Sequence, residues 1–174
     1  MSFLYREPAK IVADVIQQSM GLMASQVVLS NQKIFIPTPG PLIVVRYVGP
    51  SKIISNVDEW TDIAGTFTEV QTMCMWHLLQ IDIMSYDDTA RLRKEEIAFA
   101  VNSLLSEAQQ EMFNMNIANF TGSFLDTSFL EETKRITCYT TTISTTSVLM
   151  KQQPVQDYYV DFTRAVPPQI AVNA

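Results

Sequence analysis

The sequence has few of the residues that enzymes most often use for catalysis. Its 174 residues include one histidine, His77, and two cysteines, Cys74 and Cys138. It also lacks a glycine-rich phosphate loop and a Gly-x-Ser-x-Gly motif, the local signatures of nucleotide binding and of an activated serine. The chain is therefore expected not to be an enzyme.

Motifs for metals and cofactors are missing as well. The chain has no histidine pair and no Asp-x-Asp-x-Asp loop. Adjacent carboxylates occur at 87–88, 95–96 and 131–132, but neighbouring residues on a helix or strand point in different directions, so we interpret them as caps and solvated charge. Four other carboxylates could meet at a metal only through the fold: Asp58, Asp62, Glu69 and Asp82. We predict no catalytic residue, no cofactor and no metal site.

Charge is scarce, at 17% of the residues against a usual ~25%. This deficit indicates surface that is covered in an oligomer, although a coat rich in Ser, Thr and Gln is the alternative. The net charge of −6 argues against a groove that grips nucleic acid. The densest basic stretch, 91–94, is followed at once by Glu95 and Glu96 and is interpreted as a solvated helix face.

Long apolar runs are absent too. No window approaches the ~20 apolar residues of a membrane span, and charges interrupt the N-terminus where a signal peptide would need an apolar run. We therefore expect a chain without membrane contact, made in the cytoplasm. Cys74 and Cys138 show no zinc spacing and are expected to be reduced, with a disulfide between neighbouring strands as the alternative.

What the sequence does contain is a succession of strand and helix patterns. A short amphipathic helix follows Pro8, and an apolar run at 42–48 predicts a strand covered on both faces. Residues 67–86 predict the longest strand, with His77 among its core-facing positions as a structural histidine. A single long helix is expected up to Met112, with Leu104 and Leu105 on its buried stripe. Closing strands are predicted at 134–146, 148–150 and 158–162, the last two as a hairpin.

These elements predict an α+β fold: a single mixed, mostly antiparallel β-sheet with two main helices packed on it. We place this domain at residues 1–150 and a C-terminal strand with an extended tail at residues 151–174. The segment 51–66 is expected to be a long hairpin tip or an excursion from the domain. Candidate subunit or partner contacts lie in this segment and in the C-terminal strand: Ile53, Ile54, Trp60, Tyr158 and Tyr159.

Three segments in a fixed order carry a family resemblance. The first contains Asn31, Gln32, Pro37, Gly40, Pro41, Leu42 and Ile43. The second contains Ile81, Ile83, Tyr86 and the helix that follows. The third contains Leu125, Asp126, Thr127, Phe129, Glu131 and Arg135. Together they resemble the neck-terminator or tail-terminator-like proteins of tailed bacteriophages over residues 8–146. The chain departs from that pattern at 51–65 and after Met150.

The resemblance implies a structural protein of the virion, assembled in the host cytoplasm. Such a protein forms a ring of identical copies, six by the family pattern, that terminates the tail tube and meets the head-side connector or stopper protein. DNA passes through such a ring without specific binding. Two alternatives stay open within this class, a head-completion or stopper protein and a tail-tube subunit. A soluble module that binds a host protein is the alternative from another class.

Overall fold

The computed structural model describes residues 6–30, 35–63, 66–118, 120, 122–131 and 134–154. Within them, eight strands form a mixed sheet in the order β1-β2-β4-β8-β5, with β3 added to β4 and with β6 and β7 added to β8. The strands are β1 (Val27–Leu29), β2 (Leu42–Tyr47), β3 (Lys52–Ile63), β4 (Thr66–Ser85), β5 (Met115–Ile117), β6 (Leu125–Asp126), β7 (Phe129–Glu131) and β8 (Lys134–Pro154).

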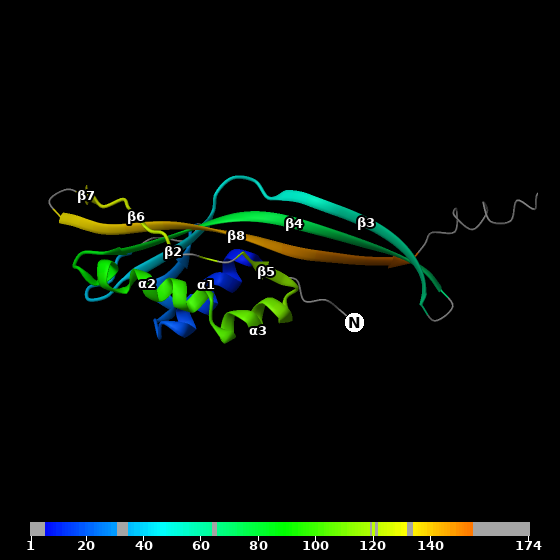
Figure 1. Ribbon diagram of the computed structural model, residues 1–174, viewed down its shortest axis with the longest axis horizontal. Helices are drawn as coiled ribbons and strands as arrows, with labels where there is room; N and C mark the ends of the chain where they lie inside the picture. The colour runs from blue at the N-terminus through cyan, green and yellow to red at the C-terminus, as the bar shows by residue number, and fades with distance from the viewer. Residues whose placement is uncertain are drawn as a thin grey trace, which may run out of the picture.

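Three α-helices lie on one side of this sheet (Figure 1). They are α1 (Pro8–Ser19), α2 (Thr89–Val101) and α3 (Leu104–Met112), and a short 3₁₀ turn, η1 (Ala24–Gln26), precedes β1. Every described strand pair is antiparallel except β1 with β2. The predicted α+β fold with a mixed, mostly antiparallel sheet is therefore confirmed. None of the helices in the described part of the chain is long and apolar enough to cross a membrane.

The body of the sheet is covered on both faces. On the helix side, Ile43, Val45, Leu79, Ile81 and Ile83 are buried against the apolar stripe of α1. The opposite face has its own smaller cluster, formed by Leu42, Val44, Ile36, Met84, Ile136 and Cys138. Consecutive residues of β2 belong to different clusters, so both faces of the strand are covered. This explains its continuous apolar run and agrees with the strand covered on both faces that the sequence predicted.

The expectation of one long helix up to Met112 is wrong. Ser103 adopts an extended backbone, accepts a hydrogen bond from the N–H of Ser106, and begins α3 as its N-cap. The new helix starts at a different rotation, so Leu104 is 82% exposed and Leu105 is half-buried, while Ser106 takes the buried position. A local side-chain cap thus overrides the apolar periodicity from which both leucines were placed in the core.

The expectation of separate strands at 134–146 and 148–150 is also wrong. β8 is one strand of 21 residues that pairs with β4 continuously from Thr137 to Pro154. It crosses residue 150, where we placed the domain boundary, without interruption. The predicted strand at 158–162 lies outside the described residues. By contrast, β4 (Thr66–Ser85) lies within one residue of its predicted range 67–86. In the segment predicted as a hairpin tip or an excursion, β3 (Lys52–Ile63) pairs antiparallel with β4.

Candidate interaction surface

β3, the first half of β4 and the last part of β8 extend past the helices as a three-stranded arm (Figure 1). We define this arm as Lys52–Ile63, Thr66–Trp76 and Ser147–Pro154. At 3.3–3.4 Å per residue, the 12 residues of β3 span about 40 Å. A projection of this length is the largest departure of the fold from a compact body.

The arm has open strand edges. Within the described chain, β3 pairs only with β4. The N–H of Val48 donates to the carbonyl of Leu78, so the even-numbered residues of β4 direct their backbone groups toward β2 and β3. Val57 pairs with Thr72 and therefore faces β4, whereas Asn56 directs its N–H and C=O outward. An exposed row of such groups is a template for another strand.

Apolar side chains are exposed along the arm. Ile53 is 60% exposed, Ile54 57% and Val57 47%. On β8, Val148 and Met150 are also exposed, and Met150 pairs with Thr72 on the same face as Val57. Ile54 is the additional residue at a β-bulge, because the register shifts between Ile53 and Ser55. The structure thus places two predicted contact residues, Ile53 and Ile54, on an uncovered surface.

The structure describes only the backbone of one of the other three predicted contact residues and does not describe the remaining two. Trp60 lies in β3 opposite Glu69, but its side chain is not described. Tyr158 and Tyr159 lie outside the described residues. Of the five, only Ile53 and Ile54 can therefore be compared with the surface of the arm.

His77 lies buried where the arm joins the body. Its Nδ1 is 2.6 Å from the Oγ of Ser51, in the β2–β3 connection, and its Nε2 is 2.9 Å from the Oγ of Ser147 on β8. The ring also lies against Tyr47, with centroids 5.7 Å apart. Burial lowers the pKa of His77 below its ordinary value of 6.5, so the imidazole is neutral at neutral pH.

The hydroxyls around His77 make it a bridge between strands. One ring nitrogen donates to a serine and the other accepts from the second, which ties the β2–β3 connection to β4 and to β8. Thr145, the cross-strand neighbour of His77, is 1% exposed, and its Oγ1 has no hydrogen-bond partner among the described residues. The described surroundings provide no carboxylate to the imidazole, so the prediction of a structural histidine agrees with its contacts.

A second apolar surface, on the outside of α2 and α3, was missed by the sequence reasoning. Its members, which we call the outer helix stripe, are 64–82% exposed: Leu92, Phe99, Leu104 and Met112. Leu92 and Phe99 are seven residues apart and Leu104 and Met112 eight, so each pair lies on one helix face. Leu104 and Met112 were expected in the core, on the stripe of one long helix, whereas Leu92 and Phe99 entered none of the predictions.

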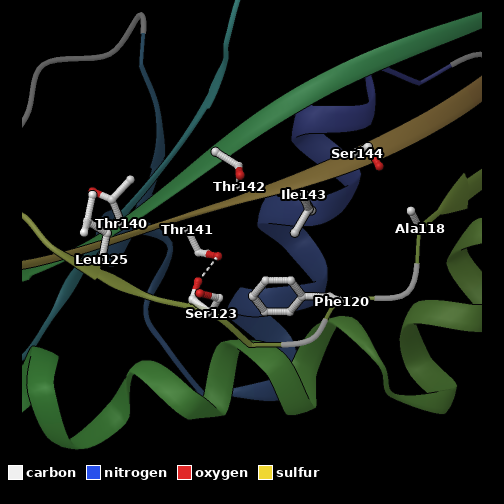
Figure 2. A pocket seen from close by; sticks show the side chains of 9 residues that line it. All are labelled: Ala118, Phe120, Ser123, Leu125, Thr140, Thr141, Thr142, Ile143 and Ser144. Atoms are coloured by element: carbon white, nitrogen blue, oxygen red, sulfur yellow. Dashed lines mark hydrogen bonds between the residues drawn. The ribbon is translucent and has the colours of Figure 1, made fainter.

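A cleft of about 370 Å³ opens at the edge of the sheet (Figure 2). It lies against β8, beside the described residues of the connection between β5 and β6. The hydroxyl of Thr141 donates to the carbonyl of Ser123 at 2.6 Å and closes one wall. The remaining lining combines apolar and hydroxyl side chains: Ala118, Phe120, Leu125, Thr140, Thr142, Ile143 and Ser144. None of these described side chains ionises near neutral pH.

The carboxylates have structural partners. Asp82 accepts from Arg46 at 3.0 Å and from Thr140 at 2.6 Å. Hydrogen bonds from the side chain and the N–H of Ser128 lower the pKa of Asp126. Those from the side chain and the N–H of Thr89 lower the pKa of Asp87 in the same way. Within the described residues, no three acidic, histidine or cysteine side chains gather as a metal site would require.

The cysteines do not pair. Cys74 lies opposite Val148, and Cys138 lies opposite Met84, ten residues further along β4. Both are free, and Cys138 is buried. The alternative of a disulfide between strands is therefore wrong.

Comparison of the chain with protein-family models and with curated proteins finds no match. The features of the described chain that bear on function are therefore its two uncovered apolar surfaces, the arm and the outer helix stripe.

Proposed function

We propose that the protein is a structural subunit of a tailed bacteriophage that assembles into a ring at the head–tail junction. In this proposal the ring terminates the tail tube and joins it to the head-side connector or stopper protein. The observation that carries the proposal is the arm, a projection with an open edge on β3 and exposed Ile53, Ile54 and Val57. The order of the three sequence segments described above supplies the phage context.

Exposure of such an arm to water costs free energy. Complete burial of an aliphatic side chain contributes roughly 1.5–3 kcal/mol, and each half-exposed side chain of the arm forgoes about half of this. Open edges also invite indiscriminate pairing unless a defined neighbour covers them. A ring of identical copies solves both problems, because each subunit covers the arm of the next and the last closes on the first.

The outer helix stripe supports the same conclusion. A head-to-tail ring needs two different surfaces on each subunit, and its ends need faces for the tube and the connector. Arm and stripe are two separate apolar surfaces on one chain. We propose no catalytic activity, since the described contacts of His77, Asp82 and Asp126 are structural.

Light scattering of the purified protein, alone and with isolated tail tubes, tests this proposal. We expect a discrete oligomer whose mass is a small multiple of 19.7 kDa, or its formation when tubes are added. A subunit that stays monomeric under both conditions, and that is absent from virions, contradicts the proposal and favours the host-binding alternative. The stopper and tube-subunit alternatives are distinguished by the position of the ring in images of the particle.

A further inference from the structure

Helix α3 has a polar side packed inward and an apolar side exposed. Ser106 is fully buried, whereas Leu104 is 82% exposed, Met112 is 64% exposed and Ala108 is exposed between them. The three apolar residues follow one another at intervals of four and therefore lie on one helix face. An amphipathic helix normally turns such a face toward a core. Within the described chain, the apolar face of α3 has no such cover.

Hydrogen bonds hold α3 in this rotation. The side chain of Gln110 donates to the hydroxyl of Ser106 at 3.1 Å and accepts from the N–H of Ile117, on β5, at 2.7 Å. Turning the helix over would break these bonds and would bury the carboxylates of Glu107 and Glu111. The apolar face is therefore covered only if another surface docks on it.

The exposed side of α3 is also acidic. Glu107 and Glu111 are exposed and one turn apart, and neither has an ion pair within the described residues. Like charges at this spacing repel each other. Glu111 also lies in the last turn, where the helix dipole disfavours negative charge and where α3 has no basic residue. A positive charge from a partner would relieve both effects, so the expected partner surface is apolar and basic.

The arm carries such a surface on the sheet face opposite the helices. We call the following four residues the arm patch: Lys52, Val57, Val148 and Met150. All four lie opposite even-numbered residues of β4, whose side chains point away from the helices. The three apolar members are at least one-third exposed. The Nζ of Lys52 lies 5.5 Å from the centre of the Trp76 ring, and no carboxylate forms an ion pair with it within the described residues.

The arm patch matches the exposed face of α3 in length and in charge. Along β3, the distance from Lys52 to Val57 is about 16 Å at the usual rise of a strand. Along α3, the distance from Leu104 to Met112 is about 12 Å at the usual rise of a helix. One surface is apolar with a lysine, and the other is apolar with two glutamates. A helix that packs its apolar face on a sheet is a standard arrangement of two layers.

Other ways of pairing α3 between copies bring like charges together. Two α3 helices packed on each other would place Glu107 and Glu111 against the same carboxylates. Toward the tip of the arm, the exposed Glu59 lies on the same face as the arm patch and would repel α3. Like charges across a contact disfavour it, so α3 is directed to the patch around Lys52.

We propose that the arm patch binds helix α3 of a second copy of this chain, with Lys52 beside Glu107 and Glu111 of the partner subunit. The helices and the arm patch lie on opposite faces of the sheet, so each subunit offers its α3 to one neighbour and receives α3 from another (Figure 1). This inference rests on the ring proposal and specifies its subunit contact. The contact uses side chains and leaves the backbone edge of β3 at Asn56 for a further strand.

Charge reversal tests the contact. One variant carries Lys52→Glu, and a second carries Glu107→Lys with Glu111→Lys; all three positions are exposed. Each variant alone places like charges across the contact. We expect the protein concentration at half-assembly, measured by light scattering alone and with tail tubes, to rise about ten-fold for each. An equimolar mixture should assemble like the unmodified protein, because the two variants then alternate and every contact joins opposite charges.

The apolar part of the contact has its own variant and control. Met112→Asp places a carboxylate in the contact and should also raise the concentration at half-assembly about ten-fold or more. Leu130→Asp is the matched control, because Leu130 is equally exposed but lies on β7, outside the contact. It should leave assembly unchanged. An equal effect of both substitutions contradicts the inference.

Three further results overturn the inference. They are charge variants that assemble like the unmodified protein, a mixture that assembles no better than its components, and an unmodified chain that stays monomeric at every concentration, alone and with tubes. The ring proposal is judged separately. A ring at tube ends that is insensitive to these reversals removes this contact and keeps the ring. A charge-dependent oligomer that is absent from tube ends and virions keeps this contact and removes the ring.

Discussion

The Nδ1 of His77 lies 2.6 Å from the Oγ of Ser51, which fixes the start of β3 to the middle of β4 where the arm leaves the body. Ser147 completes the bridge on the opposite side of the ring at 2.9 Å. One neutral imidazole thus joins β4, β8 and the β2–β3 connection. The packing where the arm meets the body therefore depends on the protonation state of His77.

Stability is expected to fall as the pH is lowered through the range of His77. Burial depresses the pKa of His77 in the folded state below 6.5, so the unfolded chain takes up the proton first. The contribution of His77 to stability is therefore fully present above pH 6.5 and is lost progressively below it. Urea unfolding between pH 8 and pH 5 measures the change. His77→Gln removes the only histidine and should flatten the upper part of this profile; an unchanged profile would show that carboxylates alone cause it.

Ile97 and Leu104 are expected to respond differently to truncation. Ile97 is fully buried under the sheet, so Ile97→Ala should lower the free energy of unfolding by about 2–5 kcal/mol. Leu104 is 82% exposed, and Leu104→Ala should change it by less than about 0.5 kcal/mol in the isolated subunit. Denaturant unfolding of both variants checks the pair. Equal losses would mean that Leu104 is covered in the free subunit, contrary to the structure.

The open edge of β3 can be blocked without breaking the arm. Asn56 directs its N–H outward, so Asn56→Pro should leave the β3–β4 ladder intact and prevent another strand from pairing there. Val57 faces Thr72, and the control Val57→Pro should instead expose the amides of β3 to exchange. We expect Asn56→Pro to reduce oligomer formation in light scattering while its unfolding midpoint changes little. Normal assembly of this variant would remove β3 from the interface.

DNA is expected to pass the ring without binding. Each chain carries a net charge of −6, and carboxylates on an inner wall repel phosphate over the ~8–10 Å Debye length at ordinary ionic strength. Fluorescence anisotropy with duplex DNA should show no salt-sensitive binding by the assembled protein. Binding that weakens steeply with added salt, or a lumen lined mainly by Lys and Arg, would contradict this expectation.

The sequence predicted those elements whose patterns are dictated by burial. The apolar run of β2, the alternation around Leu79, Ile81 and Ile83, and the stripe of α1 all follow from which faces are covered. The end of α2 could not be predicted this way, because the hydroxyl of Ser103 decided it locally. The continuity of β8 was missed since its Thr- and Ser-rich stretch shows little alternation in hydrophobicity.

The candidate surface was predicted only in outline. Ile53 and Ile54 were predicted as contacts from the low charge content and from a strand-like segment outside the apparent core, and the structure leaves both exposed. Leu104 and Met112 of the outer helix stripe were assigned to the core, because helical spacing alone does not reveal which face meets the sheet. That choice depends on the rotation of each helix after its cap, which is a tertiary property.

Electron microscopy of tail tubes mixed with the purified protein tests the central claim most directly. The account predicts a closed ring of identical copies at one end of each tube, with the arm of every subunit covered by its neighbour and no further tube growth at that end. Bare tube ends, together with a subunit that remains monomeric at micromolar concentration, would contradict it.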